Sequence, residues 1–185
     1  MIIAKDSFTS GQILSKLWLC EQLEQTSLIK RPITIWLYGG WYATTALLLL
    51  SRGKMNIRHI RNHDIDTGAL DISKRFLDSW TYNNPNLYST VAIDVNDIKF
   101  ESYPDLIINT STEHMESKQW YDNIPKGITC AFQSNDMPHD DHCHSVSNHK
   151  ELLNLYPLSK VLYSGVKKFD YPDWSFTRSM IIGIK

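Results

Sequence analysis

The chain has 185 residues, of which 42% are apolar and 21% are charged. This length fits one compact domain and is too short for two of ordinary size, and the apolar content argues against wholesale disorder. Lysine and arginine together number 19 and aspartate and glutamate 20, so the formal net charge is -1. A protein that binds nucleic acid through its overall electrostatic field is therefore disfavoured.

We expect a cytoplasmic protein with no membrane contact. The longest apolar run, 46–50, is much shorter than a membrane span. Residues 1–10 contain charges and lack the long apolar stretch of a secretory signal. The cysteines Cys20, Cys130 and Cys143 are odd in number and widely spaced, which is typical of reduced thiols and not of a disulfide framework.

The first predicted element is an amphipathic helix within residues 1–30. Thr9 and Gln12 have the spacing of a capping box at a helix start. Ile13, Leu17 and Cys20 then follow at helical spacing. The pattern predicts an N-terminal helix of about four turns that packs against a larger body.

Five strand-like segments alternate with helical ones after this helix. The segment 33–38 is apolar at odd and even positions alike, which is typical of a strand buried on both faces in a parallel sheet. The other predicted strands lie at 57–64, 88–93, 105–109 and 128–133. The predicted helices lie at 41–51, 67–80, 116–123 and 148–156. Such alternation predicts a parallel sheet with helices on both faces.

The last two predicted strands, 159–169 and 175–184, form a hairpin. Residues 170–174 between them are too few for a crossover helix, so the two strands must pair antiparallel. The sequence therefore predicts an α/β fold, a three-layer Rossmann-like sandwich. Its mostly parallel seven-stranded sheet ends in an antiparallel hairpin and carries an N-terminal helix, all in a single domain, 1–185.

The first two predicted strands end in residues suited to a nucleotide-like ligand. Gly39 and Gly40 end the first strand, where glycines let a ligand approach the backbone and the next helix N-terminus favours negative charge. Asp64 ends the second strand, more than 20 residues beyond the glycines, and an acid there can accept hydrogen bonds from ribose hydroxyls. Asp66 is the alternative, but it directly precedes a helix and fits an N-cap better.

The third strand ends in 93–96, with Asp94 and Asn96 as polar side chains. These can contact a ligand or form an ordinary polar loop.

The order of elements and these three loops resemble the class I S-adenosylmethionine-dependent methyltransferases over residues 33–184. The resemblance implies S-adenosyl-L-methionine as cofactor, with the glycine loop on its methionine part, Asp64 on the ribose and Ile65 beside the adenine. It also implies that the third loop contacts the adenine amino group and that residues 1–30 form a lid. The implied cofactor-binding residues are Tyr38, Gly39, Gly40, Trp41, Asp64, Ile65, Asp94, Val95, Asn96 and Asn109.

The glycine loop departs from the pattern of that family. The family usually has an acid before a Gly-x-Gly-x-Gly run, whereas Gly39 and Gly40 are adjacent here and no third glycine or preceding acid is present. The loop therefore leaves open an alternative, a divergent or non-catalytic accessory protein that binds the same cofactor.

The methyl acceptor is expected beside the end of the fourth strand, because ligands of open α/β sheets bind at strand carboxyl ends. The residues expected to act in catalysis are Asn109, Glu113 and His114. The residues expected to contact the acceptor are Ser111, Trp120, Gln133, Asn135 and His142. The alternative is a polar loop in which Ser111 or Thr112 caps the next helix.

Histidines concentrate in 139–149, and histidine, aspartate and cysteine are ligands of zinc and iron. A two-histidine, one-carboxylate site is one alternative. A second is a solvated active-site loop without metal, which we take as the expectation because no pair has the helical H-x-x-x-H spacing. A third is that one of these histidines acts as a base or contacts the acceptor.

The near-zero net charge favours a small-molecule acceptor, while a nucleic acid or a protein stays open. The chain has little length left for a separate substrate domain. We therefore expect acceptor recognition by the loops 110–122 and 134–148, or by a second subunit in a homodimer.

Overall fold

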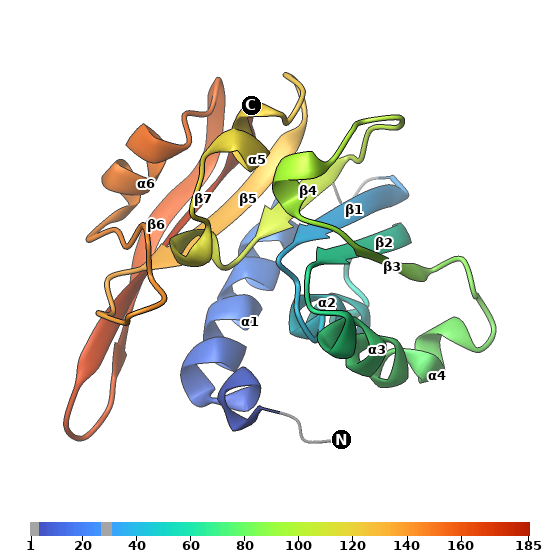
Figure 1. Cartoon of the computed structure of the whole chain (residues 1–185), viewed down its shortest axis with the longest axis horizontal. Coiled ribbons are helices and arrows are strands. Elements are labelled where there is room, and N and C mark those ends of the chain that lie inside the picture. The colour runs from blue at the N-terminus through green and yellow to red at the C-terminus, as the bar shows by residue number, and fades with distance from the viewer. Residues whose placement is uncertain (1–3, 27–30) are drawn as a thin grey trace. The chain divides into compact units, whose positions relative to one another are not determined.

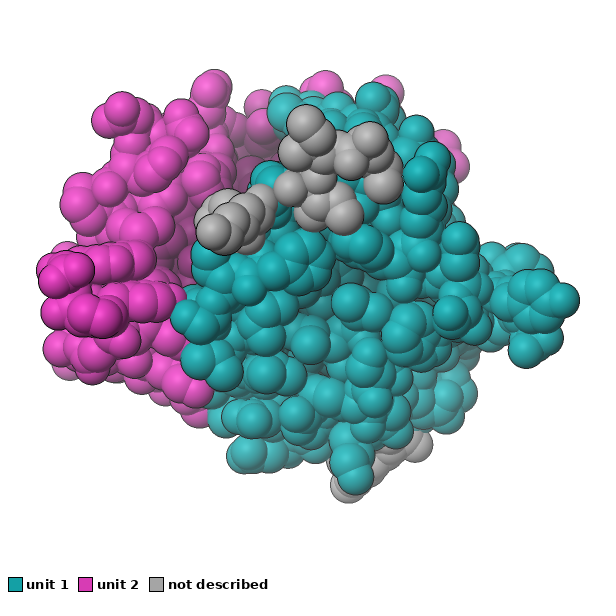
Figure 2. Space-filling view, turned by 90° about the horizontal axis from the view of Figure 1, so that it is seen from below, with its two compact units in different colours: residues 1–94 teal, residues 95–185 magenta. Residues whose placement is uncertain are grey.

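The computed structural model describes residues 4–26 and 31–185 (Figure 1). Contacts divide the chain into two compact units, Met1–Asp94 and Val95–Lys185, which Figure 2 colours teal and magenta. We call them the first and the second unit. Residues 1–3 and 27–30 of the expected lid lie outside the described residues. None of the described helices combines the length and the hydropathy needed to cross a bilayer.

The first unit contains three parallel strands in the order β3-β2-β1. Their bounds are Ile33–Tyr38 for β1, Ile57–Asp64 for β2 and Tyr88–Ala92 for β3. Side chains of both parities on β1 are buried, including Ile35, Trp36 and Leu37, as its continuous apolar pattern predicts. Because Tyr38 is in register with His63, β1 and β2 end side by side, and the loops that follow them share one edge.

The helices of the first unit are η1 (Lys5–Phe8), α1 (Ser10–Glu24), α2 (Thr44–Arg52), α3 (Thr67–Phe76) and α4 (Asp78–Thr81). α1 packs against α2, and α3 packs against β2 and β3. Thr9 is the N-cap of α1 but its side chain makes no capping hydrogen bond, so the capping box predicted there is wrong.

Two predicted helices of the first unit begin or end differently in the structure. The helix predicted from residue 41 begins at Thr44, because Trp41 and Ala43 have φ angles of 47° and 56°, outside the helical region. The helix predicted over 67–80 is interrupted at Leu77, whose φ and ψ of -104° and 4° separate α3 from α4.

The second unit contains four strands in the order β4-β5-β7-β6. Their bounds are Leu106–Asn109 for β4, Thr129–Asn135 for β5, Lys160–Asp170 for β6 and Ser175–Ile184 for β7. β4 and β5 pair parallel, while β7 pairs antiparallel with both β5 and β6. The terminal hairpin predicted from its short connection is confirmed.

The helices of the second unit are short: η3 (Val95–Asp97), η4 (Thr112–His114), α5 (Gln119–Asp122) and α6 (His149–Leu155). The cap predicted for α6 is confirmed, because Asn148 Oδ1 accepts hydrogen bonds from the backbone N–H groups of Lys150 and Glu151 at 2.9 and 3.2 Å. α6 packs on β6 and β7, and α5 packs on η3.

An aromatic cluster fills the core of the second unit. The Trp120 ring is fully buried, with its centroid 5.2 Å from that of Phe132 and 5.0 Å from that of Tyr156. Lys185 Nζ donates to the carbonyl oxygens of Asp122 and Ile124 at 2.9 and 2.7 Å, which ties the end of the chain to α5.

The Gly40→Ala variant should destabilise the first unit. A Cβ at position 40 would lie 2.0 Å from Asn62 Oδ1 and 3.0 Å from Leu37 Cβ, and the Asn62 side chain is fully buried. Such overpacking typically costs about 1–3 kcal/mol. Urea unfolding measures this loss. Gly68→Ala is the matched control, since its Cβ would meet only the exposed Asp66 cap at 3.2 Å, and equal losses in the two variants would contradict the packing argument.

Stability should fall as the pH is lowered from about 6.5 towards 4, through His63. Burial lowers the pKa of His63 to about 4, Arg61 adds to the lowering, and the hydrogen bond to the Leu37 carbonyl opposes it. Below about pH 6.5 His63 binds a proton in the unfolded chain but stays neutral in the folded chain. The free energy of unfolding therefore falls by up to about 3 kcal/mol by pH 4.

Urea unfolding at several pH values tests this dependence. A His63→Gln variant is less stable at neutral pH, since it loses ring contacts with Trp36 and Tyr38, but it lacks this part of the pH dependence. Identical pH profiles for the two proteins would show that His63 is not its source.

Candidate functional site

The loop after β1 is fastened to the end of β2 by hydrogen bonds. Gly39 N–H donates to the His63 carbonyl at 3.0 Å, and Trp41 N–H donates to Asp64 Oδ2 at 2.7 Å. The Asn62 side chain donates from Nδ2 to the Trp41 carbonyl at 3.0 Å. We call residues 39–43 the glycine loop. The structure therefore brings Gly39, Trp41 and Asp64 together, as the sequence predicts.

Asp64 and Asp66 make different contacts at the end of β2: Asp64 holds the glycine loop, and Asp66 caps α3. Asp64 is half-buried, and its Oδ1 accepts the N–H of Asp66 at 2.9 Å while Oδ2 accepts that of Trp41. A carboxylate oxygen can accept two hydrogen bonds, so each keeps acceptor capacity. Asp66 is the N-cap of α3 and accepts the N–H of Ala69 at 2.9 Å, which confirms its predicted role as a cap.

The glycine loop holds backbone strain. Trp41 and Ala43 are the non-glycine residues with positive φ among those described, and Gly39 has a φ of 59°. Each such conformation costs of order 1–2 kcal/mol for a residue with a Cβ. The Trp41 ring stacks on Tyr42 at 4.3 Å, and Tyr42 packs against Ala69 of α3, which holds the loop in place. Strain of this kind concentrates at ligand-binding sites.

The N-terminus of α2 adjoins the glycine loop without a capping side chain. Its N-cap residue is Ala43, which has no side-chain acceptor. The first N–H groups of a helix lack partners within the helix and carry partial positive charge. This end of α2 is therefore suited to an anionic group such as a carboxylate.

The predicted adenine contacts fall into three environments. Ile65 is an exposed apolar residue, with 76% of its surface accessible, directly after β2, and Asp94 is also exposed. Val95 is buried in the second unit. Asn96 Oδ1 accepts the N–H of Trp120 at 2.9 Å, so the structure uses this side chain to hold α5.

The second unit places a buried ion pair behind the loop that follows β4. Glu113 and Arg178 are both nearly inaccessible to solvent, with Arg178 Nη2 3.5 Å from Glu113 Oε1. Asn135 Nδ2 donates to the same Oε1, and Arg178 Nη1 donates to the Thr110 carbonyl at 3.0 Å. Arg178 thereby anchors the loop and balances the charge of Glu113.

Arg178 was missed by the sequence analysis. It is a lone charged residue in a strand that continues, after Ser179, with the apolar residues Met180 and Ile181. A charged residue within a mostly apolar strand indicates a buried ion pair, since charged residues are almost never fully buried without an oppositely charged partner.

Several residues predicted to act in catalysis or to contact the acceptor lie in the interior of the second unit. Asn109, Trp120 and Gln133 have no accessible surface. Asn109 Oδ1 accepts the N–H of Ser111 at 2.9 Å, and Gln133 Nε2 lies 3.5 Å from Met180 Sδ. These side chains hold the strand ends in place, while Ser111 is half-exposed.

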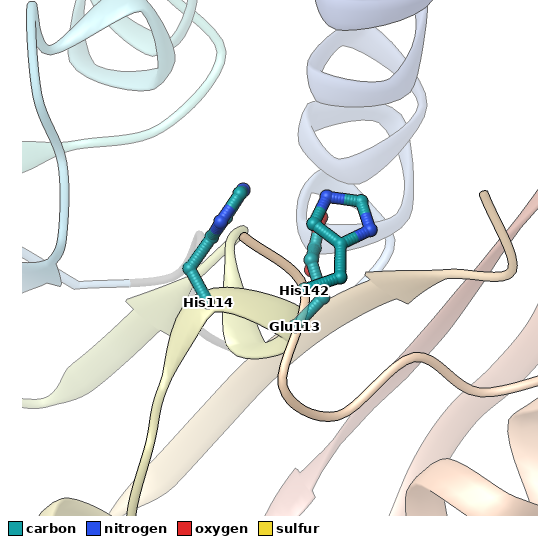
Figure 3. A group of neighbouring side chains, drawn as sticks. All are labelled: Glu113, His114 and His142. Carbon is teal, nitrogen blue, oxygen red and sulfur yellow. The ribbon is translucent and has the colours of Figure 1, made fainter. Parts of the chain in front are cut away.

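Two histidines converge beside Glu113. Figure 3 shows Glu113 and His114 on the loop after β4 and His142 on the loop after β5. Their three candidate ligand atoms all lie within 4.8 Å of one another, and the rings of His114 and His142 are 4.7 Å apart. The Glu113 carbonyl joins the two loops, because it accepts the N–H groups of Cys143 and His144 at 2.7 and 3.1 Å.

The other predicted histidines remain outside this group of three. His139 is exposed, lies 3.6 Å from an Asp141 carboxylate oxygen and contacts the His142 ring at 5.2 Å. His144 and His149 are not members of it. Of the histidine side chains in this segment, the structure therefore brings that of His142 into the group with Glu113 and His114.

Comparison with known proteins gives structural matches alone. No family model matches the chain, and no curated protein matches it significantly. The N-methyltransferase NodS from Bradyrhizobium japonicum WM9 in complex with S-adenosyl-L-homocysteine is 13% identical, with a TM-score of 0.67 over 97% of this chain and 91% of that one.

Two further methyltransferase structures are similar to the same degree. A putative sarcosine dimethylglycine methyltransferase from Galdieria sulphuraria is 11% identical, with a TM-score of 0.68 over 100% of this chain and 91% of that one. Geranyl diphosphate C-methyltransferase from Streptomyces coelicolor A3(2) is 12% identical, with a TM-score of 0.65 over 94% and 76%.

These matches confirm the fold predicted from the sequence. Identities of 11–13% carry information about fold and not about activity. The likeness extends over nearly the whole chain, and the described residues supply the mixed set of seven strands that ends in an antiparallel hairpin. The chain has the Rossmann-like fold of the class I S-adenosylmethionine-dependent methyltransferases.

Proposed function

We propose that the chain binds S-adenosyl-L-methionine and transfers its methyl group to a small molecule. The observation that carries the proposal is the 2.7 Å hydrogen bond from Trp41 N–H to Asp64 Oδ2. It fixes the glycine loop and a half-buried acid at one edge of the first unit. The structural likeness to NodS, which was solved with the product of this cofactor, supports the same choice.

The residues of the first unit fit the parts of this cofactor. The uncapped N-terminus of α2 suits the methionine carboxylate, Asp64 has acceptor capacity for the ribose hydroxyls, and the exposed Ile65 offers an apolar surface for the adenine. The cofactor supplies a methyl group that its sulfonium already activates. Tyr38, Gly39, Gly40 and Asp94 complete the proposed contacts.

Methyl transfer from a sulfonium depends chiefly on alignment of the acceptor. The residues proposed to act on the acceptor side are those after β4 and β5, and the exposed His114 is one of the titratable groups among them. The buried pair of Glu113 and Arg178 holds these loops in one arrangement, which limits the reorganisation needed on binding.

The choice of a small-molecule acceptor has two supports. The formal net charge of -1 provides no overall attraction for nucleic acid. Two of the similar structures are named for small substrates, geranyl diphosphate and sarcosine or dimethylglycine. A cytoplasmic location belongs to the same proposal, in keeping with the free cysteines Cys20, Cys130 and Cys143.

The second candidate is a non-catalytic protein that binds the same cofactor. The glycine loop favours it, since the third glycine and the preceding acid of the family pattern are absent and Trp41 occupies a strained conformation. The two candidates differ in one measurement. The enzyme converts S-adenosyl-L-methionine to S-adenosyl-L-homocysteine when a suitable acceptor is present, and the accessory protein binds both without turnover.

The Asp64→Asn variant should bind S-adenosyl-L-homocysteine about 10–100-fold more weakly than the wild type. The substitution keeps the size of the side chain but removes the charge that strengthens hydrogen bonds from the ribose, and such bonds contribute about 1.5–3 kcal/mol. Isothermal titration calorimetry measures the affinity directly.

Asp71→Asn is the matched control, because Asp71 is an exposed acid of the same unit that pairs with Lys74. Its affinity should equal that of the wild type. Equal affinities for Asp64→Asn and wild type would refute the ribose assignment, and a folded wild type that binds neither form of the cofactor would refute the proposed function.

A further inference from the structure

We propose that Glu113, His114 and His142 form a binding site for a divalent transition metal of the zinc class. All three belong to the second unit, and their ligand atoms lie within 4.8 Å of one another. The site uses no residue of the first unit and its binding of a metal needs no S-adenosyl-L-methionine, although His114 is also proposed on the acceptor side of the methyl transfer.

The hydrogen bonds of His114 and His142 involve Nδ1 and leave Nε2 of each ring able to bind a metal ion. His114 Nδ1 lies 3.2 Å from the Asp141 carbonyl, and His142 Nδ1 lies 2.8 Å from the Met137 carbonyl. A carbonyl can only accept, so each Nδ1 carries the proton and each Nε2 carries a lone pair. Ligating histidines in metal sites are typically held in this way, with one ring nitrogen donating to a backbone carbonyl.

The carboxylate of Glu113 also has one oxygen, Oε2, that can coordinate a metal ion. Oε1 receives the Asn135 amide and the Arg178 guanidinium, whereas Oε2 is buried and has no hydrogen-bond partner among the described residues. A buried carboxylate oxygen without a partner is costly. Coordination of a cation would satisfy it, and the bonds to Oε1 would orient the ligand from behind.

The arrangement is close to the geometry that zinc needs. Zinc bonds to nitrogen and oxygen are about 2.0–2.2 Å, so ligands at tetrahedral corners lie about 3.4 Å apart. His114 is exposed and His142 is half-exposed on a loop, so neither ring is enclosed by the core and both have room to move closer to a bound ion. Glu113 can stay fixed by its buried contacts.

The donor set decides the class of metal. Two imidazole nitrogens and one carboxylate suit zinc and its transition-metal neighbours, whereas magnesium and calcium prefer oxygen ligands throughout. Three protein ligands leave the fourth zinc position open, as in catalytic zinc sites. A water molecule or an oxygen of a small molecule can occupy it, and for a methyl acceptor this last step rests on the proposed function.

Metal binding by the untagged protein, stripped with a chelator, tests the site. Zn²⁺ is titrated by calorimetry, and Co²⁺ serves as a visible probe of its coordination. We expect one Zn²⁺ per chain and no comparable binding of Mg²⁺. The variants Glu113→Gln, His114→Ala and His142→Ala should each bind Zn²⁺ at least about 100-fold more weakly, since even supporting residues of metal sites contribute about 10–100-fold.

His139→Ala is the matched control, because it removes an exposed imidazole from the same loop without removing a proposed ligand. It should bind Zn²⁺ like the wild type. Absence of Zn²⁺ binding by the folded wild type would overturn the site. So would equal weakening by His139→Ala and His142→Ala, which would indicate unspecific binding to a histidine-rich loop. Circular dichroism of each variant shows whether its fold is kept, and Glu113→Gln retains an acceptor for Asn135 if an alanine variant unfolds.

Discussion

The hydrogen bond between the Trp41 N–H and Asp64 is the interaction on which the proposed cofactor site depends. Parallel strands β1 and β2 end together, so the loops after them must share one edge of the sheet. This proximity lets the Trp41 N–H in the turn after β1 reach the side chain of Asp64, the last residue of β2. The strain at Trp41 and Ala43 is tolerated since this bond, the Asn62 contact and the stacking on Tyr42 all hold the same loop.

The second unit is organised around a different constraint, the burial of one negative charge. Glu113 is inaccessible to solvent and needs compensation, which Arg178 and Asn135 provide from β7 and β5. The Glu113 backbone carbonyl meanwhile accepts from Cys143 and His144. One residue therefore fixes both loops from which the histidines of the proposed metal site project.

The proposed cofactor site and the proposed metal site lie in different units of the chain and can fail separately. If the protein binds S-adenosyl-L-homocysteine but no zinc, the proposed cofactor site stands and only the proposed metal site is refuted. A protein that binds zinc alone would point to the fold being used without its usual cofactor.

Much of the fold could be predicted from the sequence because its strands are marked by strong local patterns. β1 is apolar on both faces, so its bounds followed from the apolar pattern, while the alternation of strands and helices predicted that β1 and β2 run parallel and end at a shared edge. The start of α2 was harder to predict, since the left-handed conformations of Trp41 and Ala43 depend on tertiary contacts that a local pattern does not contain. Arg178 is 65 residues from Glu113 along the chain, and no spacing rule links them.

Hydrogen–deuterium exchange of the wild type with and without S-adenosyl-L-homocysteine tests the central claim most directly. The account predicts that protection gained on binding concentrates in 38–46 and 64–66, which contain the glycine loop, the N-terminus of α2 and the end of β2. Unchanged exchange in both segments at saturating ligand would contradict it.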